Sequence, residues 1–263
     1  MLPPNTIHPT TTPFFHPHVG DLFRNHNSNI AGIYDVGTHE GHVFVASELL
    51  DGVTLKRFTD DRPIPIYSLL SLSIEIAAAL ATAHWYGVAH RRLTPKCILV
   101  TPGKHAKIFD FGISGLLPSV VNETKVEGSA EKLDLSDEST QEEYSSEISA
   151  GAYKSPEQVR QQSVGVRSDV FSFGTILYEM VTGRRAFLGE TPAAVSRAIL
   201  SDHIDTAPLV GLLPESIAGH FETLIKRALE MEPEHRYQSA SEMAGSSTRR
   251  TSLSRTAFHP FFR

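Results

Sequence analysis

The sequence predicts an α+β fold in which a few short strands precede a mainly helical C-terminal half. Two β-prone runs, 30–37 and 42–49, are separated by a turn that contains Gly41, and this pattern is typical of a hairpin. Residues 67–86 carry apolar side chains on nearly every face, which predicts a long buried helix. With 40% hydrophobic and 21% charged residues, the composition is that of a globular protein with a sizeable core.

The remaining elements follow from turn and capping signals. Asp51-Gly52 is expected to end the second strand, and residues 96–100 and 105–109 predict two more short strands around the turn at 101–103. In the C-terminal half, Ser168 is expected to cap a helix that runs through Met180 and stops at Gly183. Pro192 is expected to open the next helix, and residues 214–230 form a third.

Three segments differ from the globular body in composition. Residues 1–20 are rich in proline and threonine and predict a disordered N-terminus. Residues 113–151 hold nine acids against two lysines, an excess of seven negative charges, which predicts a mobile acidic loop. Residues 246–263 have no sustained period and predict a flexible basic tail.

Charge and cysteine content restrict the classes of function. The net charge of -6 provides no general attraction for phosphates, so we expect no nucleic-acid partner. The single cysteine, Cys97, excludes an internal disulfide and favours a cytoplasmic location. The most apolar stretch, 67–85, is interrupted by polar residues including Glu75 and His84, so we interpret it as a core helix and expect no membrane association.

Several motifs in a fixed order resemble those of protein kinases, and the junction at 26–30 is similar to that of bacterial serine/threonine kinases of eukaryotic type. The motifs are His90-Arg91-Arg92-Leu93-Thr94-Pro95-Lys96-Cys97, Lys107-Ile108-Phe109-Asp110-Phe111-Gly112, Tyr153-Lys154-Ser155-Pro156-Glu157-Gln158, Arg167-Ser168-Asp169-Val170 and His235-Arg236-Tyr237. The resemblance covers about residues 22–245 and implies a protein kinase-like fold with a mostly helical C-lobe and a residual β-hairpin of the N-lobe.

The upstream half of the kinase pattern is not recognisable. Kinases cradle the nucleotide phosphates with a glycine-rich loop and a strand lysine. The first lysine here is Lys56, which follows the hinge-like residues 47–50, and no glycine-rich loop precedes it. The resemblance therefore implies a truncated domain over 21–245, with an N-lobe remnant at 21–50, a C-lobe at 51–245 and an activation segment at 110–157.

The catalytic loop departs from the family at three positions. The resemblance places Arg92 where the family has its base aspartate, Thr94 at the loop lysine and Cys97 at the metal-binding asparagine. An arginine cannot accept a proton at neutral pH, and a thiol is a poor ligand for Mg²⁺. Asp110 is retained as a metal ligand. We also expect Arg92 to pair with Asp110 in place of the missing metal.

Other residues retain roles that the resemblance implies. His90 and Phe111 would stack in the core, Asp169 would anchor the catalytic-loop backbone, and Glu157 would pair with Arg236. The nucleotide pocket would keep only a remnant, namely Ser47, Glu48, Leu50 and Leu99. Mg-ATP is therefore a doubtful cofactor.

Two functions of different classes remain, beside a third possibility that the chain is a degenerate gene product without a role. One is a catalytically inactive pseudokinase that acts through protein binding, with a protein partner or a second copy covering the incomplete N-lobe hairpin. The other is a serine/threonine kinase that transfers the γ-phosphate of ATP with atypical site residues. The feature that discriminates between them is the upstream lysine-glutamate pair of the family, and its absence favours the binding function.

Overall fold

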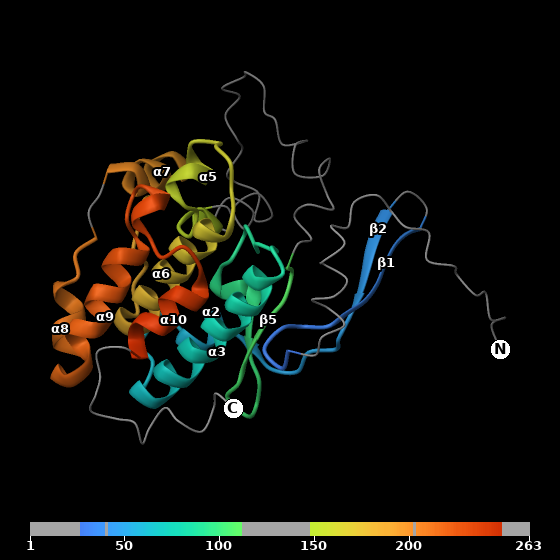
Figure 1. Ribbon diagram of the computed structural model, residues 1–263, viewed down its shortest axis with the longest axis horizontal. Coiled ribbons are helices and arrows are strands. Elements are labelled where there is room, and N and C mark those ends of the chain that lie inside the picture. The colour runs from blue at the N-terminus through green and yellow to red at the C-terminus, as the bar shows by residue number, and fades with distance from the viewer. Residues whose placement is uncertain (1–26, 40–41, 112–147, 202–203, 249–263) are drawn as a thin grey trace, which may run out of the picture.

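The computed structural model describes residues 27–39, 42–111, 148–201 and 204–248. Helices from the middle and end of the chain pack into one body, and two small antiparallel sheets lie at its side (Figure 1). This arrangement agrees with the α+β class. The predictions for residues 1–20, for most of the acidic segment and for 249–263 fall outside the described residues.

The predicted hairpin is present. Strands β1 (Ile33–His39) and β2 (His42–Ser47) pair antiparallel, and a bulge interrupts the register between Ile33 and Asp35. In Figure 1 the hairpin extends away from the helices. The first strand starts three residues later than predicted, because Ile30 forms a parallel bridge with Ile108 instead of joining the hairpin.

A junction at 27–31 fixes the base of the hairpin. The backbone of Asn29 accepts from Ile108 N at 2.8 Å, and Ala31 N donates to Ile108 O at 2.8 Å. The Asn29 side chain donates to Ala106 O, and that of Asn27 donates to the Thr82 hydroxyl, each at 2.8 Å. Asparagine side chains therefore satisfy backbone groups at this irregular segment.

A second sheet has the order β3-β4-β5 and consists of Val53–Thr54, Ile98–Val100 and Ala106–Ile108. Strands β4 and β5 were predicted, whereas the two-residue β3 is too short to give a periodic signal. Gly52 precedes β3 with φ 144°, and a Cβ there would lie 2.3 Å from Val100 O. Only glycine allows the chain to approach β4 so closely.

Helix α3 (Ile66–Trp85) is the predicted long helix, and it packs against β5, α6 and α10. By length and apolar composition it is the one described helix that could span a membrane. Its residues Leu72, Ile76 and Leu80 are fully buried within the helical body. These contacts support its interpretation as a core helix.

Helix α6 (Val166–Thr182) occupies the centre of the body, and every residue from Ser168 onward is buried. Ser168 is not the first cap residue, because the helix begins two residues earlier after Gly165. Its hydroxyl still takes part in capping, since it accepts from Gly165 N at 3.4 Å, and it also donates to Glu157. The predicted stop at Gly183 is correct. Gly183 has φ 70°, and a Cβ there would meet backbone atoms of Arg62 at 2.8 Å.

The other helices surround α6. They are α2 (Leu55–Thr59), α5 (Pro156–Val159), α7 (Pro192–Ser201), α8 (Ala207–Leu212), α9 (Glu215–Ala228), α10 (Ala240–Thr248) and the short turns η1 (Pro95–Cys97) and η3 (Pro233–His235). Helix α7 opens at Pro192 as predicted, and α9 lies within the predicted range 214–230. The predicted start of the basic tail at 246 is too early, since α10 continues through Thr248.

Candidate functional site

Asp169 on α6 organises the loop at 90–97. Its carboxylate is fully buried and accepts from His90 N at 2.7 Å and from Arg91 N at 2.8 Å. His84 Nε2 lies 3.1 Å from the same carboxylate, while His84 Nδ1 accepts from Ala240 N at 3.2 Å. Three donors from two segments therefore hold one carboxylate, and the backbone is anchored as the resemblance implied.

His90 connects this loop to the segment that carries Asp110. Its Nε2 donates to Phe109 O at 3.0 Å, because Nδ1 already accepts from Arg92 N at 3.4 Å. The ring of His90 contacts Phe111, with 4.9 Å between centroids and a tilt of 59°. The two rings are thus in contact but tilted, which is a favourable arrangement for aromatic side chains.

Glu157 and Arg236 form a buried ion pair through two parallel bonds of 2.8 and 2.9 Å. Arg236 also donates to Glu230 O and Met231 O, and Ser168 donates to Glu157 at 2.6 Å. Burial alone would raise the pKa of Glu157, but Arg236 and Ser168 outweigh it and lower the pKa to about 2. The pair therefore has the partners that a buried charge requires.

The three substituted loop positions lie on the outer side of the same loop. Arg92 is exposed, whereas Thr94 and Cys97 are half-buried. The Thr94 hydroxyl lies 3.4 Å from Cys97 Sγ, and the Cys97 thiol donates to Arg92 O at 3.5 Å. The loop between His90 and Cys97 contains no carboxylate.

Cys97 is in hydrogen-bonding contact with the His90 ring. Burial would raise the pKa of the Cys97 thiol, but His90 and Thr94 together outweigh burial and lower that pKa. The pKa of His90 is raised, because the Cys97 contact and the Asp169 charge outweigh the opposing effect of burial. Cys97 is therefore a polar, partly exposed thiol and not the buried apolar side chain that its type suggests.

Asp110 is exposed and has φ 66°, a left-handed conformation that few residues other than glycine adopt. The predicted ion pair with Arg92 is wrong for the part of the chain that the structure describes, since no ion pair there involves either residue. Both side chains are exposed, so hydration competes with their attraction. Within the described ranges, no group of three His, Cys, Asp or Glu residues is placed to hold a metal ion.

The predicted nucleotide-pocket residues are divided between the end of the hairpin, which holds Ser47 and is followed by Glu48 and Leu50, and the central strand β4, which holds Leu99. Glu48 is bound by the Lys107 ammonium group and accepts from Gly32 N at 3.2 Å. Leu99 is buried and is the register partner of Lys107, so Leu99 and Glu48 are close neighbours. Ser47 is exposed at the end of β2, and Leu50 is half-buried. The carboxylate of Glu48 is thus already used within the protein.

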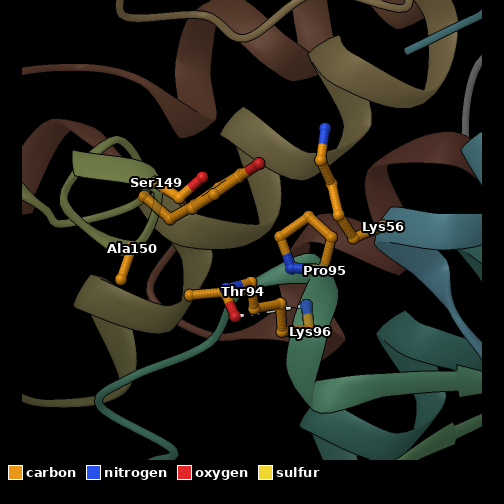
Figure 2. A pocket seen from close by; sticks show the side chains of 7 residues that line it. Lys56, Thr94, Pro95, Lys96, Ser149 and Ala150 are labelled. Atoms are coloured by element: carbon orange, nitrogen blue, oxygen red, sulfur yellow. Dashed lines mark hydrogen bonds between the residues drawn. The ribbon is translucent and has the colours of Figure 1, made fainter. Parts of the chain in front are cut away.

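A hollow lies between the catalytic loop and the segment at 149–153 (Figure 2). Ser149 and Ala150 line one side, and Thr94, Pro95 and Lys96 line the opposite side. Its space, which is open to solvent, is about 220 Å³.

Sequence reasoning missed a polar network behind the hollow. Lys56 reaches Glu179 at 3.3 Å and also contacts Asp61, and the Tyr153 hydroxyl donates to Glu179. Burial, and then the Glu179 charge, raise the pKa of Tyr153. Arg185 donates to the Ser149 hydroxyl. The one signal in the sequence is Glu179 itself, an acid within the apolar run Ile176–Val181 of α6.

The fold and the anchored loop define a protein of the kinase class, and comparison with known proteins gives the family. Residues 21–247 match the model of the protein kinase domain. The chain is 32% identical over 222 residues to a probable serine/threonine-protein kinase of Clostridium perfringens, which covers 83% of this chain and 29% of that protein. It is 31% identical over 225 residues to the serine/threonine-protein kinase PknB of Mycobacterium leprae, which covers 83% and 32% respectively.

The chain therefore belongs to the protein kinase family, and its relatives are bacterial serine/threonine kinases of eukaryotic type. It spans about a third of the length of these curated relatives.

Proposed function

We propose that this protein is a kinase-fold binding module, a pseudokinase that contacts other proteins and does not transfer phosphate. The observation that carries the proposal is Arg92, which is exposed on a loop without a carboxylate, at the position of the family's proton acceptor. A guanidinium group has no acceptor atom and stays protonated. Loss of general-base catalysis alone slows such reactions by about 10²- to 10⁴-fold.

The neighbouring side chains support the same proposal. Thr94, at the loop-lysine position, has no charge with which to contact a phosphate, and its hydroxyl faces Cys97 Sγ. A Mg²⁺ ion prefers oxygen ligands, so the donor set of Asp110 and the Cys97 thiol does not suit it. Within the anchored loop, the backbone geometry is thus retained while the groups for phosphate chemistry are replaced.

Phosphotransfer to protein serine or threonine is the second candidate. The relatives named as serine/threonine kinases favour it, and so does Asp110, which keeps the metal-binding acid of the family motif. In that case an unusual group would have to accept the proton of the substrate hydroxyl.

A phosphotransfer assay separates the two candidates. The purified protein is incubated with labelled ATP and Mg²⁺ or Mn²⁺, alone and with a generic basic protein, and we expect no incorporation above background. The Asp110→Ala variant is the matched control, because a contaminating kinase would label both preparations equally. Incorporation that the wild type shows and Asp110→Ala loses would overturn the proposal and support the kinase function.

A further inference from the structure

The solvent-facing side of helix α3 is an apolar stripe. Tyr67, Ile74 and Trp85 are 86%, 38% and 86% exposed, although the opposite side of the same helix lies in the core. Their spacings of 7 and 18 residues are close to two and five full turns, so the three side chains lie along one line on the helix. We call this line the α3 stripe, and its other members are Ser71, Ala78 and Ala81.

The α3 stripe differs from the outer face of an ordinary surface helix. Such a helix places charged and polar side chains opposite its buried face. None of the six residues of the α3 stripe is charged. The one acid of the helix, Glu75, accepts from Ala106 N on β5 and contacts His105, so it binds the small sheet and does not belong to the stripe. A continuous apolar surface of this kind is typical of a site that another segment covers.

The chain brings a further segment close to this stripe. Helix α10 packs against α3 (Figure 1), and Ala240 N at its start donates to His84 Nδ1 at 3.2 Å. Because α10 ends at Thr248, residues 249–263 begin about 12 Å from this bond. Fifteen extended residues span about 50 Å, and α3 is about 30 Å long, so the whole stripe is within their reach.

Residues 249–263 have the side chains that an apolar stripe requires. They contain Phe258, Phe261 and Phe262, and they contain no acid. Each buried aromatic side chain removes about 150–250 Å² from water, and the largest exposed apolar patch of a typical monomer measures about 300–600 Å². Three phenylalanines are therefore enough to cover a surface of this size.

We infer that the α3 stripe binds residues 257–262 of the same chain through their three phenylalanines. The driving force is the removal of apolar surface from water on both segments. Since the segment is joined to α10, the binding is intramolecular and does not depend on the protein concentration. The inference goes beyond the proposed function, because no residue of the α3 stripe belongs to the loop at 90–97.

Fluorescence of Trp85 tests the inference, because it is the single tryptophan of the chain. In the full chain we expect Trp85 to be protected from the quencher acrylamide and to emit at a shorter wavelength than a solvated tryptophan. The triple variant Phe258→Ser/Phe261→Ser/Phe262→Ser keeps the length and the charge of the chain. It should shift the emission to longer wavelength and raise the quenching constant.

Variants outside residues 249–263 provide the controls. Phe14→Ser/Phe15→Ser removes two phenylalanines near the start of the sequence and should leave Trp85 protected. Ile74→Glu places a charge within the α3 stripe and should expose Trp85 although the phenylalanines are intact. Leu188→Glu changes a residue that is 68% exposed outside α3 and should leave the fluorescence unchanged. Circular dichroism confirms that each variant is folded.

Four results would overturn the inference. Two of them are a wild-type Trp85 as accessible as that of the triple variant, and protection that persists in Ile74→Glu. The third is exposure in Phe14→Ser/Phe15→Ser, which would assign the α3 stripe to the segment before residue 27. The fourth is protection that disappears on dilution, which would assign the stripe to a second copy of the chain. All four leave the proposed function in place, since phosphotransfer is measured separately.

Discussion

The two sides of the loop at 90–97 differ in their contacts with the rest of the protein. The inner side is fixed by Asp169, which binds two backbone amides, and by the His90 ring, which binds Phe109 O. The outer side carries Arg92, Thr94 and Cys97, of which Arg92 is exposed and the other two are half-buried. The comparison teaches that the conformation of this loop is set by the buried contacts of Asp169 and His90.

The largest effect on stability is expected from breaking the buried ion pair of Glu157 and Arg236. Arg236→Met would leave Glu157 buried without its main partner and should lower the free energy of unfolding by about 3–5 kcal/mol. Urea denaturation at neutral pH measures this loss. The double variant with Glu157→Gln should lose clearly less than the sum of the single changes, and strict additivity would show that the pair is not coupled.

Lowering the pH should weaken the same ion pair. The pKa of Glu157 is about 2 in the folded protein against an ordinary value of 4.5. A depressed pKa gives stability that is fully present above pH 4.5 and is lost as the pH falls through about 2. The stability difference between wild type and Glu157→Gln should therefore shrink over this range. A difference that stays constant from pH 5 to pH 2 would contradict the assignment.

Asp169→Asn tests the anchor of the inner side directly. The carboxylate of Asp169 accepts hydrogen bonds from three donors, and the NH2 group of asparagine would face one of these donors with hydrogens of its own. A buried polar group left without a partner in this way costs roughly 1–3 kcal/mol. Hydrogen exchange should become faster at His90 N and Arg91 N in this variant. Unchanged protection of both amides would show that the loop is held by other contacts.

Gly174 tests how closely the central helix is packed. A Cβ at Gly174 would lie 2.8 Å from the Cβ of Ala228 on α9, and overpacking of this kind costs about 1–3 kcal/mol. Gly174→Ala should therefore lower the thermal midpoint. Adding Ala228→Gly should restore part of the loss, and a failure to restore any of it would locate the strain elsewhere.

The larger elements and the buried ion pair could be predicted from the sequence, whereas a polar network and a short strand could not. The hairpin, the long helix and the roles of Asp169, Glu157 and Arg236 follow from periodicity and from ordered motifs. The network of Lys56, Glu179 and Tyr153 did not, because Lys56 and Glu179 are 123 positions apart in the sequence and no motif links them. Strand β3 was missed because two residues carry no period.

Exposure explains the error about Arg92. Opposite charges about 4 Å apart attract by roughly 4 kcal/mol at an effective dielectric of 20, and this attraction suggested a pair with Asp110. In the structure both side chains are exposed, so water solvates each charge separately. The sequence supplies the charges but not the solvent exposure that decides whether they pair.

The smallest effect on stability is therefore expected at the outer side, from Arg92→Asp. Exposed positions without a partner usually change the free energy of unfolding by less than about 0.5 kcal/mol, so this variant should unfold at nearly the same urea concentration as the wild type. It should also stay inactive in the phosphotransfer assay, because Thr94 and Cys97 remain. A loss above about 1 kcal/mol would show that Arg92 does hold Asp110, as the sequence alone suggested. Measured beside Arg236→Met, a near-zero effect at Arg92 would demonstrate that the stability of the fold depends on the buried ion pair and not on this exposed loop position.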